Sequence, residues 1–187
     1  MEYVDRADTR ADGEAVGART RFEEIAREIL EPLRRFLARR TDAATADDVL
    51  AETLLVCWRR YDELPDPALP FAYGVARWCL ANAERGARRQ RRLAGKIATL
   101  DPPREAPDLV GDDRLAEAMA ELSPDDAELM RLWAWEQLAP GEIATVLDIT
   151  PNAAGIRLHR ARKRLRTALR KVEAAAGHEE TTEGGRR

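Results

Sequence analysis

The residues best suited to binding a ligand form a cationic stretch near the C-terminus. Between Arg157 and Lys171 the sequence holds eight Arg or Lys residues and no Asp or Glu. A solvated helix face usually mixes charges of both signs, so a long run of one sign favours contact with nucleic-acid phosphates. The alternative is a structural helical hairpin whose basic face is only solvated. The net charge of −3 does not exclude DNA, because acidic and basic residues are segregated along the chain.

The residues just before this stretch predict a helix-turn-helix. A short helix from Pro140 would bury Ile143 and Leu147, and a break follows at 148–150. Thr150 can cap a long helix from Pro151. The stripe expected to be buried on that helix is Ala154, Leu158, Ala161, Leu165 and Ala168. In a helix-turn-helix the second helix enters the major groove, so we expect the helix from Pro151 to bind duplex DNA.

A second cationic group lies at the end of another predicted helix, which begins near Pro70. The first half of this helix is apolar and includes Phe71, Trp78 and Cys79. The second half holds no acid after Glu84. Its arginines are Arg85, Arg88, Arg89, Arg91 and Arg92. The chain therefore carries two separate basic helices.

No residues are arranged for catalysis or metal binding. His159 lies in the basic helix and His178 near the C-terminus, and neither has a nucleophile or metal ligand at a suitable spacing. Cys57 and Cys79 lie among apolar residues, without a second Cys or His at ligand spacing, so we expect both in the core. These observations predict a protein that is not an enzyme and that needs no cofactor and no metal.

The sequence contains no segment typical of export or membrane insertion. The N-terminus is acidic and lacks the apolar region of a signal peptide. No apolar run approaches the ~20 residues that cross a bilayer. We therefore expect a soluble, cytoplasmic protein without membrane insertion.

The apolar periodicity predicts an all-α chain with two small helical domains joined by a flexible linker. Helical spacing begins at Phe22, Pro32 is expected to kink or split the first helix, and Thr45 is expected to cap the second. Three prolines at 63–70 predict a loop. The predicted map is a flexible tail at 1–20, a helical domain at 21–96, a linker at 97–113, a helix-turn-helix domain at 114–175 and a flexible tail at 176–187.

Three blocks of the sequence resemble bacterial sigma-70 family factors. Residues 121–169, ELSPDDAELMRLWAWEQLAPGEIATVLDITPNAAGIRLHRARKRLRTAL, resemble region 4, the C-terminal DNA-binding domain. They are most similar to the extracytoplasmic-function (ECF) group, whose recognition helix typically ends in RLHRARKRLR. Residues 46–64, ADDVLAETLLVCWRRYDEL, resemble region 2.2, and residues 71–92, FAYGVARWCLANAERGARRQRR, resemble the helix that meets the −10 element. The resemblance covers about residues 22–170.

The resemblance implies a sigma factor of the ECF group. Such a factor binds core RNA polymerase and directs promoter-specific transcription initiation by recognising −10 and −35 elements. The implied partners are core RNA polymerase and promoter DNA. ECF factors are commonly held inactive by an anti-sigma factor, which is a further candidate partner.

The resemblance also implies roles for individual residues. Contact with the −35 element is implied for Thr150, Asn152, Ala153, Arg157, Arg160, Arg162, Lys163 and Arg164. Contact with the −10 element is implied for Phe71, Tyr73, Asn82, Arg85, Arg88, Arg89, Arg91 and Arg92. Docking on core polymerase is implied for Asp47, Asp48, Glu52, Trp58 and Arg59.

Some of these positions have a second interpretation. Asp47 and Asp48 also suit the positive end of a helix dipole, and Phe71 suits a core position equally well. Trp78 stands where the family often has a polar Asn, and core packing is the better interpretation of it. Gly155-Ile156 replaces the family's Lys or Arg followed by Ser, which predicts weak −35 binding or readout partly by DNA shape.

Two other classes of protein remain as alternatives. One is an ordinary helix-turn-helix regulator that dimerises through its N-terminal half and binds DNA without polymerase. The other is an enzyme with a DNA-binding appendage, for which the sequence holds no motif. Comigration with core polymerase distinguishes a sigma factor from a regulator.

Overall fold

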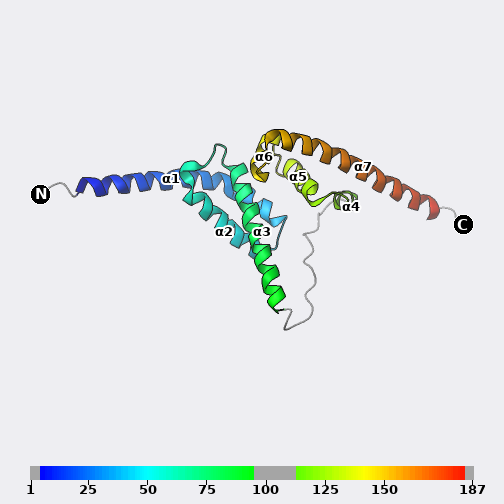
Figure 1. The fold of residues 1–187 in the computed structure, drawn as a ribbon, viewed down its shortest axis with the longest axis horizontal. Helices are drawn as coiled ribbons and strands as arrows, with labels where there is room; N and C mark the ends of the chain where they lie inside the picture. Colours follow the sequence, from blue (N-terminus) through cyan, green and yellow to red (C-terminus); the bar gives the residue numbers. More distant parts are fainter. Residues whose placement is uncertain (1–4, 95–112, 184–187) are drawn as a thin grey trace. The chain divides into compact units, whose positions relative to one another are not determined.

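The computed structural model describes residues 5–94 and 113–183, with side chains described for residues 17–92 and 114–174. All regular structure in these ranges is helical, which confirms the predicted all-α class (Figure 1). The chain divides into two units, Met1–Ala106 and Pro107–Arg187. The predicted linker lies outside the described residues except for Asp113. No helix in the described ranges combines the length and the apolar content that crossing a bilayer requires.

Three helices that pack on one another form the first unit: α1 (Asp5–Ala38), α2 (Ala43–Arg59) and α3 (Leu69–Ala94). A 3-10 turn, η1 (Tyr61–Glu63), follows α2. Their shared core contains Ile29, Leu33, Phe36, Leu37, Val49, Leu50, Cys57, Ala72, Ala76, Cys79 and Leu80. Thr53 is also buried, and its hydroxyl donates to the Val49 carbonyl oxygen at 2.7 Å.

Two details of this unit differ from the sequence prediction. Helix α1 is continuous through Pro32, where a kink or split was expected. The buried neighbours Ile29 and Leu33 hold both sides of this point in the core, which offsets the cost of a proline inside a helix. Helix α2 begins at Ala43, and its cap is Asp42 in place of Thr45. The Asp42 carboxylate accepts from the Thr45 amide at 3.2 Å and from the Thr45 hydroxyl at 2.8 Å.

The second unit consists of α4 (Asp113–Ala120), α5 (Pro124–Ala134), α6 (Pro140–Leu147) and α7 (Pro151–Glu183). Ser123 caps α5, its hydroxyl accepting from the Asp126 amide at 3.2 Å. At the start of α6 the Glu142 carboxylate accepts from the Ala139 amide at 2.7 Å. Helix α7 packs against α4, α5 and α6, so the long helix is the element that assembles the unit.

Both predicted tails contain helix in the structure. Helix α1 already begins at Asp5, and α7 continues to Glu183. Adding a residue to an existing helix gains a hydrogen bond without a new nucleation cost, so a polar segment can extend a packed helix. The sequence of these extensions has no apolar periodicity, so that signal could not predict them.

Candidate nucleic-acid interface

The turn between α6 and α7 fixes the start of the long basic helix. Asp148 adopts a left-handed conformation with a φ of 52°, which ends α6. The Ile149 amide then donates to the Ala144 carbonyl oxygen at 3.0 Å. The Thr150 hydroxyl accepts from the Ala153 amide at 3.2 Å and caps α7 as predicted. The two helices pack closely, and the segment has the order of a helix-turn-helix.

One side of α7 is buried against the rest of its unit, as the sequence predicted. Ala154, Leu158, Ala161 and Ala168 are at most 5% exposed, and Leu165 is partly buried. The opposite side is exposed and holds no acidic residue from Pro151 to Val172. This side can therefore approach a polyanion without charge repulsion from its own helix.

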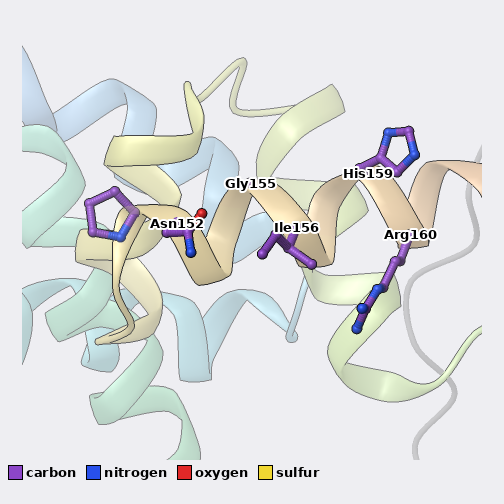
Figure 2. A pocket seen from close by; sticks show the side chains of 6 residues that line it. Asn152, Gly155, Ile156, His159 and Arg160 are labelled. Carbon is purple, nitrogen blue, oxygen red and sulfur yellow. The ribbon is translucent and has the colours of Figure 1, made fainter.

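An open hollow of about 400 Å³ lies on this exposed side, near the start of α7 (Figure 2). The residues that line it are Pro151, Asn152, Gly155, Ile156, His159 and Arg160. Asn152, Ile156 and Arg160 project from the same side of the helix in Figure 2, as expected for residues spaced by four. Asn152 and Arg160 belong to the predicted −35 set, whereas Pro151, Gly155, Ile156 and His159 do not.

Of the four additional residues of the hollow, Ile156 could have been found from the sequence. The predicted buried stripe on α7 includes Ala154 and Leu158, and Ile156 lies halfway between them, about 200° around the helix from each. Ile156 is indeed 45% exposed, and His159 is exposed as well. Thr150, Ala153 and Arg157 do not line the hollow.

Two of the predicted −35 cations have partners inside the second unit. The Arg164 guanidinium pairs with the buried carboxylate of Asp126 on α5. The Arg162 guanidinium lies 4.6 Å from the centre of the Trp133 ring. Both arginines thus brace α7 against α5 as well as carrying charge. Lys163 lies between them and is exposed.

Helix α3 carries the second basic surface. Arg85, Arg88, Arg89, Arg91 and Arg92 are all exposed. The Arg85 guanidinium donates to the side-chain oxygen of Asn82, and Arg88 pairs with Glu84 at 3.3 Å. These contacts lie within the helix and leave the guanidinium groups at the surface.

Two of the three aromatic residues of α3 lie opposite to where the sequence predicted them. Trp78, expected in the core, is 57% exposed, because helical periodicity turns it about 200° away from the buried Ala76. Tyr73, expected at the −10 element, is 3% exposed, and its ring lies 4.8 Å from that of Phe36 in the core. Tyr73 is therefore not a base-contacting surface residue. Trp78 shares a face with Asn82, four residues later.

Phe71 lies at the start of α3 and is half-buried. The Arg60 guanidinium is 5.3 Å from the centre of its ring, in a cation–π arrangement. Part of the Phe71 ring thus packs within the unit and part remains accessible. Both the core interpretation and the DNA interpretation of this residue agree with its position.

The exposed side of α2 has an apolar centre and an acidic edge. Leu55 is 46% exposed, and Trp58 is 37% exposed although its ring contacts those of Phe22 and Tyr61 at 5.1 and 5.7 Å. Asp47, Asp48, Glu52 and Arg59 are exposed on the same helix. The first turn of α2 contains no acid, so Asp47 and Asp48 lie beyond the range in which the helix dipole acts most strongly.

The two cysteines are buried, as the sequence predicted. Burial raises the pKa of the Cys57 thiol to about 11, and the neighbouring Cys79 adds to the shift. The pKa of Cys79 is raised by burial and then by the Glu52 carboxylate. Neither thiol is thus a reactive thiolate at neutral pH. Among the residues with described positions, no three His, Cys, Asp or Glu side chains form a group that could hold a metal ion.

Comparison with known sequences identifies relatives that match most of the chain. Residues 112–165 match the family described as "Sigma-70, region 4". The chain is 32% identical over 138 residues to the ECF RNA polymerase sigma factor SigL of Mycobacterium tuberculosis, a match that covers 70% of this chain and 78% of SigL. It is also 32% identical over 168 residues to the RNA polymerase sigma factor CarQ of Myxococcus xanthus, covering 84% of this chain and 94% of CarQ.

Solved structures share the fold at lower sequence identity. One is the sigma factor RpoE of Bartonella quintana in complex with the anti-sigma factor NepR, with a TM-score of 0.54 and 19% identity, covering 80% of this chain and 96% of RpoE. Another is CnrH in complex with the cytosolic domain of CnrY, with a TM-score of 0.53 and 19% identity, covering 80% and 88%.

Proposed function

The chain belongs to the extracytoplasmic-function group of sigma-70 factors, and we propose that three of its helices divide the work of promoter recognition. As a member of that group it binds core RNA polymerase and directs promoter-specific transcription initiation. The proposal concerns the residues: α7 contacts the −35 duplex, α3 contacts the −10 strand and α2 docks on polymerase. A sigma factor works beside the polymerase, so the proposal places the protein in the bacterial cytoplasm.

The assignment of α7 to the −35 element rests on the observation that carries the whole proposal. The exposed side of α7 follows a tight turn and is free of acids from Pro151 to Val172. Its first turns expose Asn152, Ile156 and Arg160 in one hollow, where a major-groove helix presents residues to base edges. Arg157, which directly follows Ile156, and Lys163, further along the helix, supply positive charge for contacts with phosphates. Contacts with phosphates then position the helix, and contacts with bases specify the sequence.

The assignment of α3 to the −10 element rests on a combination of an aromatic ring with cations. Single-stranded DNA is held by rings on which bases stack and by a basic surface along the backbone. Trp78 offers an exposed ring, Asn82 lies one turn later, and five exposed arginines follow. Phe71 contributes its accessible edge. Tyr73 is left out of this proposal because it is buried.

The assignment of α2 to polymerase rests on its mixed surface. Leu55 and Trp58 present apolar area, and Asp47, Asp48 and Glu52 surround it with negative charge. A nucleic acid would be repelled by these carboxylates, whereas a protein surface with cations and apolar side chains fits them. The apolar centre with a charged rim is the usual anatomy of a protein–protein interface.

We also propose that an anti-sigma factor regulates this protein. The support is structural likeness to RpoE, which was solved in complex with the anti-sigma factor NepR. Such a partner would compete with polymerase for exposed helical surface. The proposal predicts that part of the protein purified from its native host is bound to a second polypeptide. In that complex the two chains should be present in a fixed ratio.

The test of the proposed function is a pair of measurements with core RNA polymerase. In gel filtration the protein should comigrate with core enzyme, and run-off transcription on genomic fragments should start at discrete sites only when the protein is present. A helix-turn-helix regulator would bind DNA by itself and remain separate from polymerase. Failure to comigrate, together with tight specific binding of the free protein at physiological salt, would favour the regulator.

A further inference from the structure

Gly155 occupies a position in α7 where the folded protein gives no reason for a glycine. It lies in the interior of a long helix, where glycine is less favourable than alanine. A Cβ atom added at Gly155 would meet nothing within 4 Å. Neither the packing of the unit nor the backbone conformation therefore excludes a side chain here. Close approach by a ligand is one use of a missing side chain that this open position permits, and the residues around Gly155 decide whether it applies here.

Ile156, the next residue, is apolar and exposed on the same surface. It is 45% exposed, and it lines the hollow with Gly155, Asn152 and Arg160. A single exposed isoleucine is ordinary on a protein surface. Its position is informative because the surrounding surface is cationic and because Gly155, which leaves open space at its own position, lines the same hollow.

The chemistry of the hollow selects one feature of a DNA duplex. The absence of acids on this side of α7 fits a polyanion. In the major groove the four bases present hydrogen-bonding groups, and thymine alone adds a methyl group at C5. An apolar side chain beside open space suits that methyl, while Asn152 and Arg160 suit the polar edges of adjacent bases.

We propose that the hollow at Gly155 and Ile156 receives the C5-methyl group of a thymine in the −35 element. The missing side chain of Gly155 lets the base edge come close to the helix, and the Ile156 side chain covers the methyl. This inference rests on the proposed role of α7 in −35 binding and adds the base that it selects. At Gly155 and Ile156, where the family usually has Lys or Arg followed by Ser, an apolar contact with the base thus takes the place of a cationic one.

The first arm of the test removes the methyl group from the DNA. A promoter is selected from a library with a randomised −35 element by transcription with the holoenzyme, and each thymine of that element is then replaced singly by deoxyuridine. At one position the replacement should weaken holoenzyme binding about fourfold, the effect of burying one methyl group. The other thymines serve as internal controls. A selected element without thymine on either strand, or equal affinity at every position, overturns the proposal.

The second arm removes the apolar side chain from the protein. Ile156→Ala should bind the thymine and deoxyuridine promoters with equal affinity, so the two changes are not additive. Lys163→Ala is the matched control on the same side of α7. It should weaken binding to both promoters by the same factor and keep the fourfold difference between them. If Ile156→Ala keeps that difference, another residue contacts the methyl and the assignment to Ile156 is wrong.

The third arm fills the open space without disturbing the fold. Gly155→Ala should raise the melting temperature, since the added Cβ meets no atom and alanine favours the helix. The same variant should bind the selected promoter at least threefold more weakly and lose part of its sensitivity to the methyl. A stable variant with unchanged affinity and unchanged sensitivity to the methyl shows that the space is not used.

The outcomes separate this inference from the proposed function. If the holoenzyme initiates at discrete promoters and Lys163→Ala weakens it, but no thymine responds to deoxyuridine, only the methyl contact fails. If the protein neither comigrates with core polymerase nor supports initiation, the proposed function itself fails.

Discussion

Arg164 of α7 donates a hydrogen bond to the carboxylate of Asp126, which lies in the first turn of α5 and is 8% exposed. The amide of the same aspartate donates to the Ser123 hydroxyl at 3.2 Å. One residue thus connects the start of α5 with the middle of α7. The ion pair gives Arg164 a structural task in addition to the phosphate contact that the sequence predicted.

Arg164→Ala should lower the stability of the second unit. The substitution leaves a largely buried carboxylate without its cation, and we expect the free energy of unfolding to fall by roughly 1–2 kcal/mol. The guanidinium is 58% exposed, which keeps the loss below that of a fully buried pair. Urea denaturation measures the change. Lys163→Ala is the control and should stay within about 0.5 kcal/mol of wild type. Equal stability of the two variants would mean that the pair contributes nothing.

Reversing the charge of Asp47 and Asp48 should strongly weaken the binding of the protein to core polymerase. Both carboxylates are exposed on α2, so Asp47→Lys with Asp48→Lys should leave the fold intact. We expect at least a tenfold loss of affinity for core enzyme, because like charges would then face each other across the interface. Fluorescence anisotropy of the labelled protein measures the affinity. Glu117→Lys, an exposed acid on α4, is the matched control and should bind core enzyme normally. If the double variant binds core enzyme with wild-type affinity, the docking surface does not include Asp47 and Asp48.

The helical architecture could be predicted because each packed helix has to bury an apolar stripe. Ile143 and Leu158 follow the 3.6-residue period, and Ser123-Pro124 is a strong signal for a helix start. The cap of α2 was missed because Asp42 and Thr45 both carry suitable oxygens, and only the backbone conformation decides between them. The helical ends beyond 21 and 175 carry no apolar periodicity in the sequence, so periodicity could not predict them.

The candidate site was harder to predict than the fold, and the aromatic residues of α3 show why. The family positions of Tyr73 and Trp78 predict a role for each, but only the helical periodicity of α3 shows which side of the helix each one faces. The buried residues Ala72, Ala76 and Cys79 define the inner face of α3, and that face includes Tyr73 and excludes Trp78. On α7 the same reasoning, applied to Ala154, would have singled out Ile156.

Trp78→Ala should impair contact with the −10 strand without unfolding the protein. The ring is 57% exposed, so its removal costs little packing. Stacking of one base on an aromatic side chain contributes about 1–3 kcal/mol, which corresponds to a loss of roughly 5- to 150-fold in affinity. The measurement is binding of the holoenzyme to a single-stranded −10 oligonucleotide. Trp78→Phe keeps a ring and should retain most of the affinity. If Trp78→Ala strongly lowers the stability of the protein but leaves its DNA binding unchanged, Trp78 serves packing and does not contact the −10 strand.

The buried thiols should be unreactive in the folded protein and should make its stability sensitive to alkaline pH. The pKa of Cys57 is raised from 9.0 to about 11, so the folded state holds this proton more tightly than the unfolded state does. The stabilising contribution is therefore complete below pH 9 and is lost as the pH rises toward 11. Cys57→Ala should flatten that decline in urea titrations at several pH values. Rapid reaction of the native protein with a disulfide reagent at pH 8 would show that the thiols are not buried in solution.

Within α7, base readout and phosphate contact should separate when Arg160 and Lys163 are compared. Arg160 lines the hollow near the start of the helix, where side chains reach base edges, and Lys163 is exposed further along, where phosphates are in reach. Arg160→Ala should change which −35 sequences are used, because a good bidentate base contact gives about 1–3 kcal/mol of discrimination. Lys163→Ala should lower activity on all sequences alike and reduce the salt dependence by about one counterion. Transcription from a randomised −35 library at two salt concentrations measures both effects. The same uniform loss from both substitutions would mean that Arg160 reads no base, and that the exposed side of α7 holds the promoter through its phosphates alone.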